Sequence, residues 1–218
     1  MNYLLMQIND STFPIGSYTQ SYGLETYVVK GLISSAEDAL SYILAYMWGQ
    51  FLYTDLLAVS LAYDAKEHEL VKLDRLLLAV MSAREVREAS IKLGRRFIKT
   101  VEALDVVFLR DTYNMYIKEH ANYTVAYGAF CASVGASKLE AMECFVYSSM
   151  SAMVTNIVKL VPLSQTEGQR MLFNLAQYYE ELIRRAMMLD ENYLGLSAPG
   201  NDVRCMQHEV LYSRQYMS

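Results

Sequence analysis

Proline is nearly absent from the middle of this chain. The 218 residues include only three prolines, Pro14, Pro162 and Pro199. Proline is the residue that most reliably interrupts a helix, because it lacks a backbone N–H and its ring clashes with the preceding turn. A span of this length without proline, from position 15 to position 161, predicts long uninterrupted helices.

Cysteine and long hydrophobic runs are also scarce. The three cysteines, Cys131, Cys144 and Cys205, are widely spaced and form no CxxC pair. That pattern is typical of reduced thiols in the cytoplasm rather than of a disulfide framework. The charge-free stretches are shorter than the roughly 18 residues that a membrane span needs, and the first residues do not resemble a signal peptide. We therefore expect a soluble cytoplasmic protein.

The signatures of common catalytic sites are missing too. The chain has no GxxxxGK[ST] loop or GxGxxG turn for phosphates, and no HExxH, CxxC or GxSxG motif. A site assembled from distant residues stays open, although only His68, His120 and His208 could contribute histidine to it. The net charge of -5 disfavours nucleic acid as a ligand. We expect a protein that is not an enzyme and binds no cofactor stably.

What the sequence does contain is helical periodicity. Two S-x-x-E sequences, Ser137 to Glu140 and Ser164 to Glu167, match the capping box that begins a helix. We predict an all-α fold, a single domain over residues 1–218 built as a bundle of roughly eight to ten helices. The apolar stripes comprise Leu40, Ile43, Leu44, Met47, Phe51 and Leu52, then Leu70, Leu73, Leu77, Val80 and Met81, then Met142, Val146, Met153, Ile157 and Leu160, and finally Met171, Leu175, Tyr178, Leu182 and Met188 in one helix that ends before Asp190.

Two local clusters allow both a structural and a functional interpretation. Cys205 and His208 have the spacing and chemistry of a metal-ligand pair, but two ligands do not make a site, so we favour a packed Cys and a hydrogen-bonding His. The run from Arg84 to Arg96 is the densest in charge. Ion pairs along a helix, such as Arg84 with Glu88, are the favoured interpretation, and a basic patch for an acidic partner is the alternative.

The last residues are unusual for a chain end. A disposable tail is normally compositionally plain, whereas residues 201–218 contain a His-Glu pair, two arginines and several aromatic or sulfur side chains. The tail either docks on its own domain or becomes ordered on a partner. The 18 tyrosines and 13 methionines likewise fill an irregular core or mark a protein interface.

Four motifs in sequence order resemble the signatures of the UreF family of urease accessory proteins. They span nearly the whole chain: Leu5-x-Gln7-x-x-Asp10-Ser11-x-Phe13-Pro14-Ile15-Gly16-Ser17-Tyr18 continuing to Ser21-x-Gly23-Leu24-Glu25; Arg87-Glu88-Ala89-Ser90 with Gly94-Arg95; Pro162-Leu163-Ser164-Gln165-Thr166-x-Gly168-Gln169; and Asn201-Asp202-x-x-x-Met206-Gln207-His208-Glu209-x-x-Tyr212-Ser213-Arg214.

The resemblance implies an all-helical homodimer that bridges two other urease accessory proteins, a β-rich scaffold called UreD or UreH and a P-loop GTPase called UreG. The assembly would insert nickel into the urease apoprotein at the expense of GTP, which the GTPase binds. Residues 191–218 would form a tail that docks on the scaffold. The partner-binding residues that the resemblance implies are Asp10, Phe13, Pro14, Gly16, Tyr18, Arg87, Glu88, Arg95, Met206, His208, Glu209, Tyr212 and Arg214.

Two further hypotheses stay open beside the assembly role. The chain could regulate GTP hydrolysis by its partner, for which Arg84, Arg87 or Arg95 would supply positive charge near a phosphate. A stand-alone nickel carrier would use Cys205 and His208 as ligands. Whether nickel passes through this chain at all is a question that its sequence leaves open.

Overall fold

The computed structural model describes residues 2–109 and 122–218, and their regular structure is entirely helical. The all-α prediction is therefore confirmed. In chain order the elements are α1 (Tyr3–Ile8), η1 (Ser17–Thr19), α2 (Leu24–Val29), α3 (Ala36–Tyr46), η2 (Met47–Leu56), α4 (Leu57–Asp64), α5 (Glu67–Val80), α6 (Arg84–Glu102), α8 (Tyr123–Ser133), α9 (Lys138–Leu160), α10 (Gln165–Ala176), α11 (Tyr179–Met188), η3 (Glu191–Tyr193) and α12 (Pro199–His208).

The helices begin at the caps that the sequence indicates. The Ser164 side chain accepts a hydrogen bond from the Glu167 amide, and the Glu167 carboxylate accepts from the Ser164 amide, which completes a capping box at the start of α10. At the start of α9, Ser137 accepts from the Glu140 amide. Pro162 follows the end of α9 as predicted, because proline cannot continue a helix.

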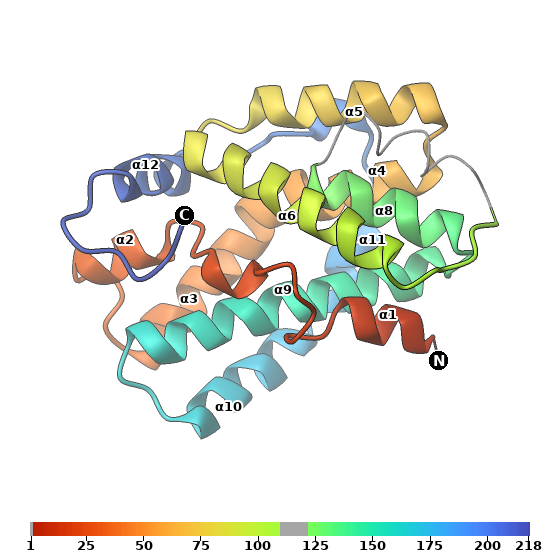
Figure 1. Cartoon of the computed structure of the whole chain (residues 1–218). Helices are drawn as coiled ribbons and strands as arrows, with labels where there is room; N and C mark the ends of the chain where they lie inside the picture. Colours follow the sequence, from red (N-terminus) through yellow and green to blue (C-terminus); the bar gives the residue numbers. More distant parts are fainter. Residues whose placement is uncertain (1, 110–121) are drawn as a thin grey trace.

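Helix α9 runs through the bundle and packs against elements from both halves of the chain, including α1, α4, α8, α10 and α11 (Figure 1). Helix α8 lies against both α4 and α6. The α4–α8 contact is very close at Gly128, where an added Cβ would come within 2.6 Å of the Val59 carbonyl oxygen. Only glycine allows the two backbones to approach in this way.

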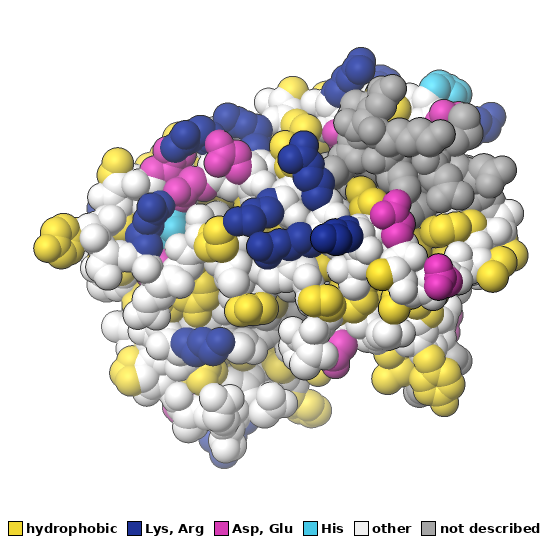
Figure 2. Space-filling model, in the orientation of Figure 1, with side chains coloured by type: hydrophobic (Ala, Val, Ile, Leu, Met, Phe, Trp, Pro, Cys, Tyr) yellow, Lys and Arg dark blue, Asp and Glu magenta, His cyan; other side chains and the backbone are white. Residues whose placement is uncertain are grey.

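Charge is unevenly distributed over the surface. On the face shown in Figure 2, Lys and Arg side chains gather over the position that α6 occupies in Figure 1. No helix among the described residues is both long enough and apolar enough to cross a membrane.

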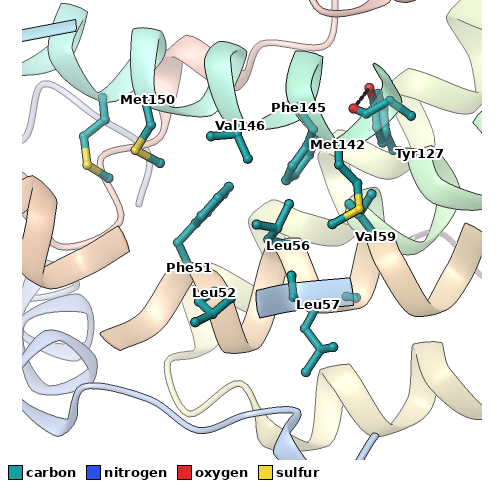
Figure 3. Close-up of a cluster of buried hydrophobic side chains, with 14 of the residues drawn as sticks. Phe51, Leu52, Leu56, Leu57, Val59, Tyr127, Met142, Phe145, Val146 and Met150 are labelled. Carbon is teal, nitrogen blue, oxygen red and sulfur yellow. Dashed lines mark hydrogen bonds between the residues drawn. The ribbon is translucent and has the colours of Figure 1, made fainter. Parts of the chain in front are cut away.

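The hydrophobic core joins η2 and α4 to α8 and α9 (Figure 3). The rings of Phe51 and Phe145 stack with their centroids 5.8 Å apart. Tyr127, which is fully buried, donates its hydroxyl to the Ala141 carbonyl at 2.9 Å and accepts from the Asn9 side chain at 2.8 Å. Because both functions of its hydroxyl are satisfied, Tyr127 can be buried without the cost of an unpaired polar group.

Two features differ from the sequence-based expectation. The prediction of one helix through Met171 and Met188 was wrong, because α10 ends at Ala176 and α11 begins at Tyr179. The break lets α10 pack on α3 and α9 while α11 packs on η2, α4 and α9. The long helix after Ser35 is also not uniform: its middle third, η2, is π-helical, with wider turns that shift the side chains that follow.

Candidate functional site: the docked C-terminal tail

The tail after α12, residues 209–218, folds back onto the N-terminal part of its own chain. The Met217 amide donates to the Thr19 carbonyl at 2.8 Å, and the Ser21 amide donates to the Ser218 carbonyl at 2.6 Å. The Ser21 hydroxyl donates to the same Ser218 oxygen at 2.7 Å. Of the two alternatives left open by the sequence, the structure has the first, a tail docked on its own domain.

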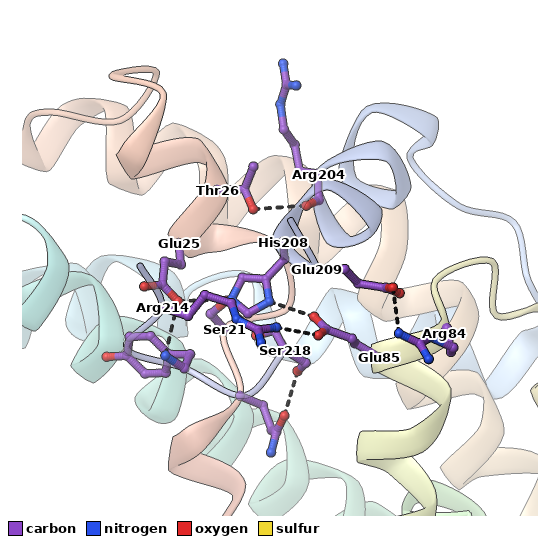
Figure 4. A network of polar contacts seen from close by, with 12 residues as sticks. Ser21, Glu25, Thr26, Arg84, Glu85, Arg204, His208, Glu209, Arg214 and Ser218 are labelled. Atoms are coloured by element: carbon purple, nitrogen blue, oxygen red, sulfur yellow. Dashed lines mark hydrogen bonds and ion pairs between the residues drawn. The ribbon is translucent and has the colours of Figure 1, made fainter. Parts of the chain in front are cut away.

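A buried histidine connects α12 to two other helices (Figure 4). His208 is fully buried, and its Nε2 lies 3.0 Å from Glu25 Oε2 on α2 while its Nδ1 lies 2.7 Å from Glu85 Oε2 on α6. Each ring nitrogen of His208 thus lies within hydrogen-bond distance of a carboxylate oxygen. His208 thereby holds three elements together that are far apart in the sequence.

The same two carboxylates bind the tail directly. Glu25 accepts from the backbone amides of Gln215 at 2.7 Å and Tyr216 at 3.1 Å. Glu85 accepts from Arg214 Nη1 at 2.7 Å. Glu25 and Glu85 therefore each contact both His208 and the tail, and hydrogen-bond partners of this kind make a buried carboxylate tolerable.

A second ion pair secures the end of α12. Arg84 Nη2 lies 2.8 Å from Glu209 Oε2, and this contact holds the pKa of the Glu209 carboxyl below its ordinary value. The expectation that Arg84 pairs with Glu88 along its own helix was therefore wrong: the partner of Arg84 comes from the tail. A tertiary contact has replaced the local one because α12 ends beside the start of α6.

The N-terminal loop between α1 and α2 is built around Gly16. Its φ of 83° is in the left-handed region, which glycine adopts at no steric cost. An added Cβ would also approach Arg96 Nη1 to 2.5 Å, and that guanidinium donates to the Ile15 carbonyl at 3.1 Å. The loop therefore lies close against α6.

The expected partner-binding residues of this loop are divided between surface and core. Pro14 and Tyr18 are exposed, whereas Phe13 is buried with its ring against Phe97. Asp10 is exposed and accepts from the Thr12 amide and hydroxyl, which lowers the pKa of the Asp10 carboxyl. The partner-binding roles of these residues stay predictions.

The remaining expected residues divide in the same way. On α6, Arg87 is engaged by the backbone carbonyls of Met81 and Ser82, while Glu88 and Arg95 are exposed. On α12 and the tail, His208 is buried, Met206 is exposed and Tyr212 is fully exposed. Sequence reasoning singled out His208 but not its two carboxylates. Glu25 lies in the first of the four motifs, and Glu85 lies in the charged run from Arg84 to Arg96. No spacing along the sequence relates either carboxylate to His208.

Cys205 and His208 lie one turn apart on α12, but neither is free to bind a metal. Burial raises the pKa of the Cys205 thiol to about 12, which disfavours the thiolate that a metal requires. Both ring nitrogens of His208 contact carboxylates. Within residues 2–109 and 122–218, no group of three or more His, Cys, Asp or Glu side chains is placed to hold a metal ion. His68 is exposed, and His120 lies outside the described residues.

A small, partly open pocket lies beside the N-terminal loop. Its volume is about 70 Å³, and its polar lining includes Gln20, Tyr22, Asp55 and Asn156. Asp55 comes from η2 and accepts from the Thr54 hydroxyl at 2.8 Å. Burial raises the pKa of the Asp55 carboxyl to about 6. A cavity of this size and polarity can hold water.

Comparison with known proteins gives the chain a family. The UreF family model matches residues 33–176. Curated proteins named urease accessory protein UreF are similar along almost the whole chain: that of Haemophilus influenzae Rd is 35% identical over 98% of this chain and 94% of its own length. Those of Actinobacillus pleuropneumoniae serotype 5b and Bacillus sp. TB-90 are both 34% identical, the latter over 100% of both chains. This chain therefore belongs to the UreF family of urease accessory proteins.

Proposed function

We propose that this chain is a non-enzymatic assembly protein for urease. It joins the scaffold accessory protein UreD or UreH to the GTPase UreG, and the complex inserts nickel into the urease apoprotein with GTP bound by the GTPase. The observation that carries this proposal is similarity to urease accessory proteins along 98% or more of the chain. The sequence supports it, because it contains no phosphate-binding loop and GTP must therefore be bound elsewhere.

The docked tail supports a role in binding the scaffold. With its backbone fixed by Glu25 and Ser21, the segment presents apolar side chains outward: Val210 is 82% exposed and Tyr212 is fully exposed. Aromatic residues and methionine are enriched in protein interfaces, and a fixed segment loses little entropy on binding. Tyr212 is therefore the tail residue that we assign to the scaffold interface.

Tyr212→Ala tests this assignment more cleanly than Arg214→Ala. The Tyr212 side chain is fully exposed, so its removal should leave the docked tail in place, whereas Arg214 forms an ion pair with Glu85. We expect Tyr212→Ala to weaken scaffold binding by about tenfold, as the loss of an interface tyrosine does, with stability unchanged. Tyr193→Ala, at another exposed tyrosine, is the matched control. Unchanged affinity in Tyr212→Ala would remove the tail from the interface.

Nickel loading of urease tests the assembly role as a whole. The urease subunits and their accessory proteins are co-expressed with and without this chain, and nickel per purified urease is measured together with activity. We expect apo-urease only when the chain is missing. Equal nickel in both preparations would refute the assembly role.

A regulatory effect on the GTPase is the second candidate function. Of the three arginines considered for it, Arg84 pairs with Glu209 and Arg87 donates to backbone carbonyls. Arg95 is exposed and has no hydrogen bond or ion pair among the described residues, so it is the arginine that we assign to this role. We expect Arg95→Gln to change the effect of this chain on GTP hydrolysis by the purified GTPase. A rate that does not respond to the wild-type chain at all would exclude this role.

The stand-alone nickel carrier has the least support. Nickel titration of the isolated chain by calorimetry tests it directly. Because Cys205 and His208 are both committed to internal contacts, we expect no binding tighter than about micromolar.

A further inference from the structure

Four basic residues lie on one exposed face of α6. They occur at intervals of three, one and three residues, which places them side by side on the helix surface, while Leu93 and Phe97 on the other side are buried in the core. Figure 2 shows Lys and Arg side chains gathered over this part of the surface. We call Lys92, Arg95, Arg96 and Lys99 the cationic stripe.

The cationic stripe has no ion-pair partner within the part of the chain that the structure describes. Among the described residues, no carboxylate oxygen lies within 4.0 Å of any of its four charged groups. Glu88 and Glu102 lie on α6 just beyond the two ends of the stripe, but neither forms an ion pair with it. Other surface cations on this chain do have such partners: Lys72 pairs with Glu191 and Arg184 with Glu181.

Concentrating these charges is unfavourable in the isolated chain. Lys92 and Arg96, like Arg95 and Lys99, are like-charge pairs four residues apart, a spacing that destabilises a helix. The chain as a whole carries a net charge of -5, so the positive field is local to this helix face. A set of carboxylates placed over the stripe would relieve the repulsion, and the fork of Arg95 could bind one of them bidentately.

The surroundings of the stripe match those of a protein interface. Arg96 contacts the N-terminal loop through the Ile15 carbonyl, and Lys92 Nζ lies 4.0 Å from Met217 Sδ in the docked tail. Exposed apolar side chains occur in both neighbouring segments: Tyr18 is 55% exposed and Met217 is 50% exposed. Apolar groups beside arginine are typical of protein interfaces, whereas a phosphate backbone would meet the repulsive net charge.

We propose that the cationic stripe is the docking surface for an acidic segment of a protein partner, with carboxylates at helical spacing along about 10 Å of α6. The identity of the partner rests on the proposed function: it is the scaffold protein, because Lys92 lies beside Met217 in the tail that we assign to the scaffold interface. The stripe adds a specific chemistry, because it assigns an acidic complement to the scaffold protein. Arg84 and Arg87 lie outside the stripe, one turn or more before Lys92, and Arg84 is paired with Glu209.

Charge reversal tests the proposal. The variant Arg95→Glu/Lys99→Glu and the matched control Lys66→Glu/Arg75→Glu change the net charge equally. The control reverses two exposed cations away from the stripe, at the N-cap of α5 and within that helix. Affinity of each purified chain for the scaffold protein and for the GTPase is measured by biolayer interferometry at about 50 and 300 mM NaCl, because screening weakens ionic contacts. A third variant, Arg95→Gln/Lys99→Gln, removes the two positive charges without adding negative ones. Its thermal unfolding and its partner binding are compared with those of the wild type, so that misfolding can be distinguished from the loss of ionic contacts.

We expect the stripe reversal to weaken binding of the scaffold protein by about tenfold or more, the control to bind as the wild type does, and the loss to shrink at high salt. A loss confined to the GTPase would overturn the assignment to the scaffold. Equal binding by stripe variant and wild type, or an equal loss in the control, overturns the proposal. Loss of binding to single-stranded RNA with intact partner binding also overturns it, in favour of a nucleic-acid surface. If the wild-type chain binds neither protein, the proposed function fails as well, whereas failure of the stripe variants alone leaves that function standing.

Discussion

At the scale of single residues, His208 shows how a polar side chain near a chain end can serve as an internal connector. Its ring lies between Glu25 and Glu85, and each of these carboxylates also binds the tail. The resemblance implied that His208 contacts a partner, but the residue is fully buried in this chain. Any influence of His208 on a partner is therefore transmitted through the position of the tail.

Replacing His208 should destabilise the protein strongly. In His208→Ala, Glu25 and Glu85 stay largely buried and lose the ring that hydrogen-bonds to both of them. Leaving a buried charged group without its hydrogen-bond partner costs about 3 kcal/mol, so we expect a loss of roughly that size in the free energy of unfolding, measured by urea denaturation. Met206→Ala, at an exposed site on the same helix, should cost less than about 1 kcal/mol. A similar small loss in both variants would contradict the connector role.

Asp55 should make stability depend on pH. Its pKa is raised from 3.8 to about 6 in the folded chain, so the folded state keeps this proton to a higher pH than the unfolded state does. Asp55 therefore lowers the stability as pH rises from about 4 to about 6, and the penalty persists above that range. We expect Asp55→Asn to raise the free energy of unfolding by about 1–3 kcal/mol near pH 7.5, and by almost nothing near pH 4.

The control for this prediction is Asp105→Asn, which removes the same charge from an exposed site. It should leave the pH dependence of urea denaturation unchanged. If Asp55→Asn followed the wild type at both pH values, the carboxyl of Asp55 would not be the source of the effect.

At the scale of elements, the tail packs against α2 and the N-terminal loop. Its backbone donors and acceptors pair with Thr19, Ser21 and Glu25, and the ring of Tyr216 is only 8% exposed. Because these contacts join the two ends of the sequence, the tail and the N-terminal loop should become ordered or disordered together.

A matched pair of tyrosines tests the docking of the tail. We expect Tyr216→Ala, which removes a buried ring, to lower the free energy of unfolding by about 2–3 kcal/mol and to speed hydrogen exchange at the Ser21 and Tyr22 amides. Tyr212→Ala, only four residues away but fully exposed, should change neither quantity. Equal exchange at Ser21 in both variants would show that the tail is not held by the Tyr216 ring.

At the scale of the whole molecule, several large apolar side chains are exposed on the surface. Phe173 on α10 is 81% exposed and lies beside a shallow hollow lined by Thr166, Gln169, Arg170 and Asn174. An exposed aromatic ring of this kind often marks an interface. The homodimer that the resemblance implies stays a prediction, and Phe173 offers a place to test it.

We expect light scattering to give twice the monomer mass for the wild type and a lower mass for Phe173→Asp, because a carboxylate in an apolar interface is unfavourable. Tyr3→Asp, at a similarly exposed aromatic on α1, is the control and should keep the wild-type mass. A monomeric wild type would contradict the prediction, and a dimeric Phe173→Asp would place the interface elsewhere.

Features that depend on residues close together along the chain were predictable without the structure. The capping box at Ser164, the end of α9 before Pro162 and the amphipathic stripes of α5 and α9 were all predictable, because capping, proline geometry and helical periodicity act over a few residues. The family was recognisable for a related reason, since its motifs are continuous stretches of sequence.

Contacts between residues that are far apart along the chain were not predictable and are known only from the tertiary structure. Glu25 and Tyr216 are 191 positions apart, and no local rule relates them. The break between α10 and α11 and the π-helical η2 likewise follow from packing against other elements rather than from local propensity. The docked tail, its buried His208 and the unpaired cationic stripe beside it are consequences of long-range packing, because burial and charge pairing depend on the whole fold.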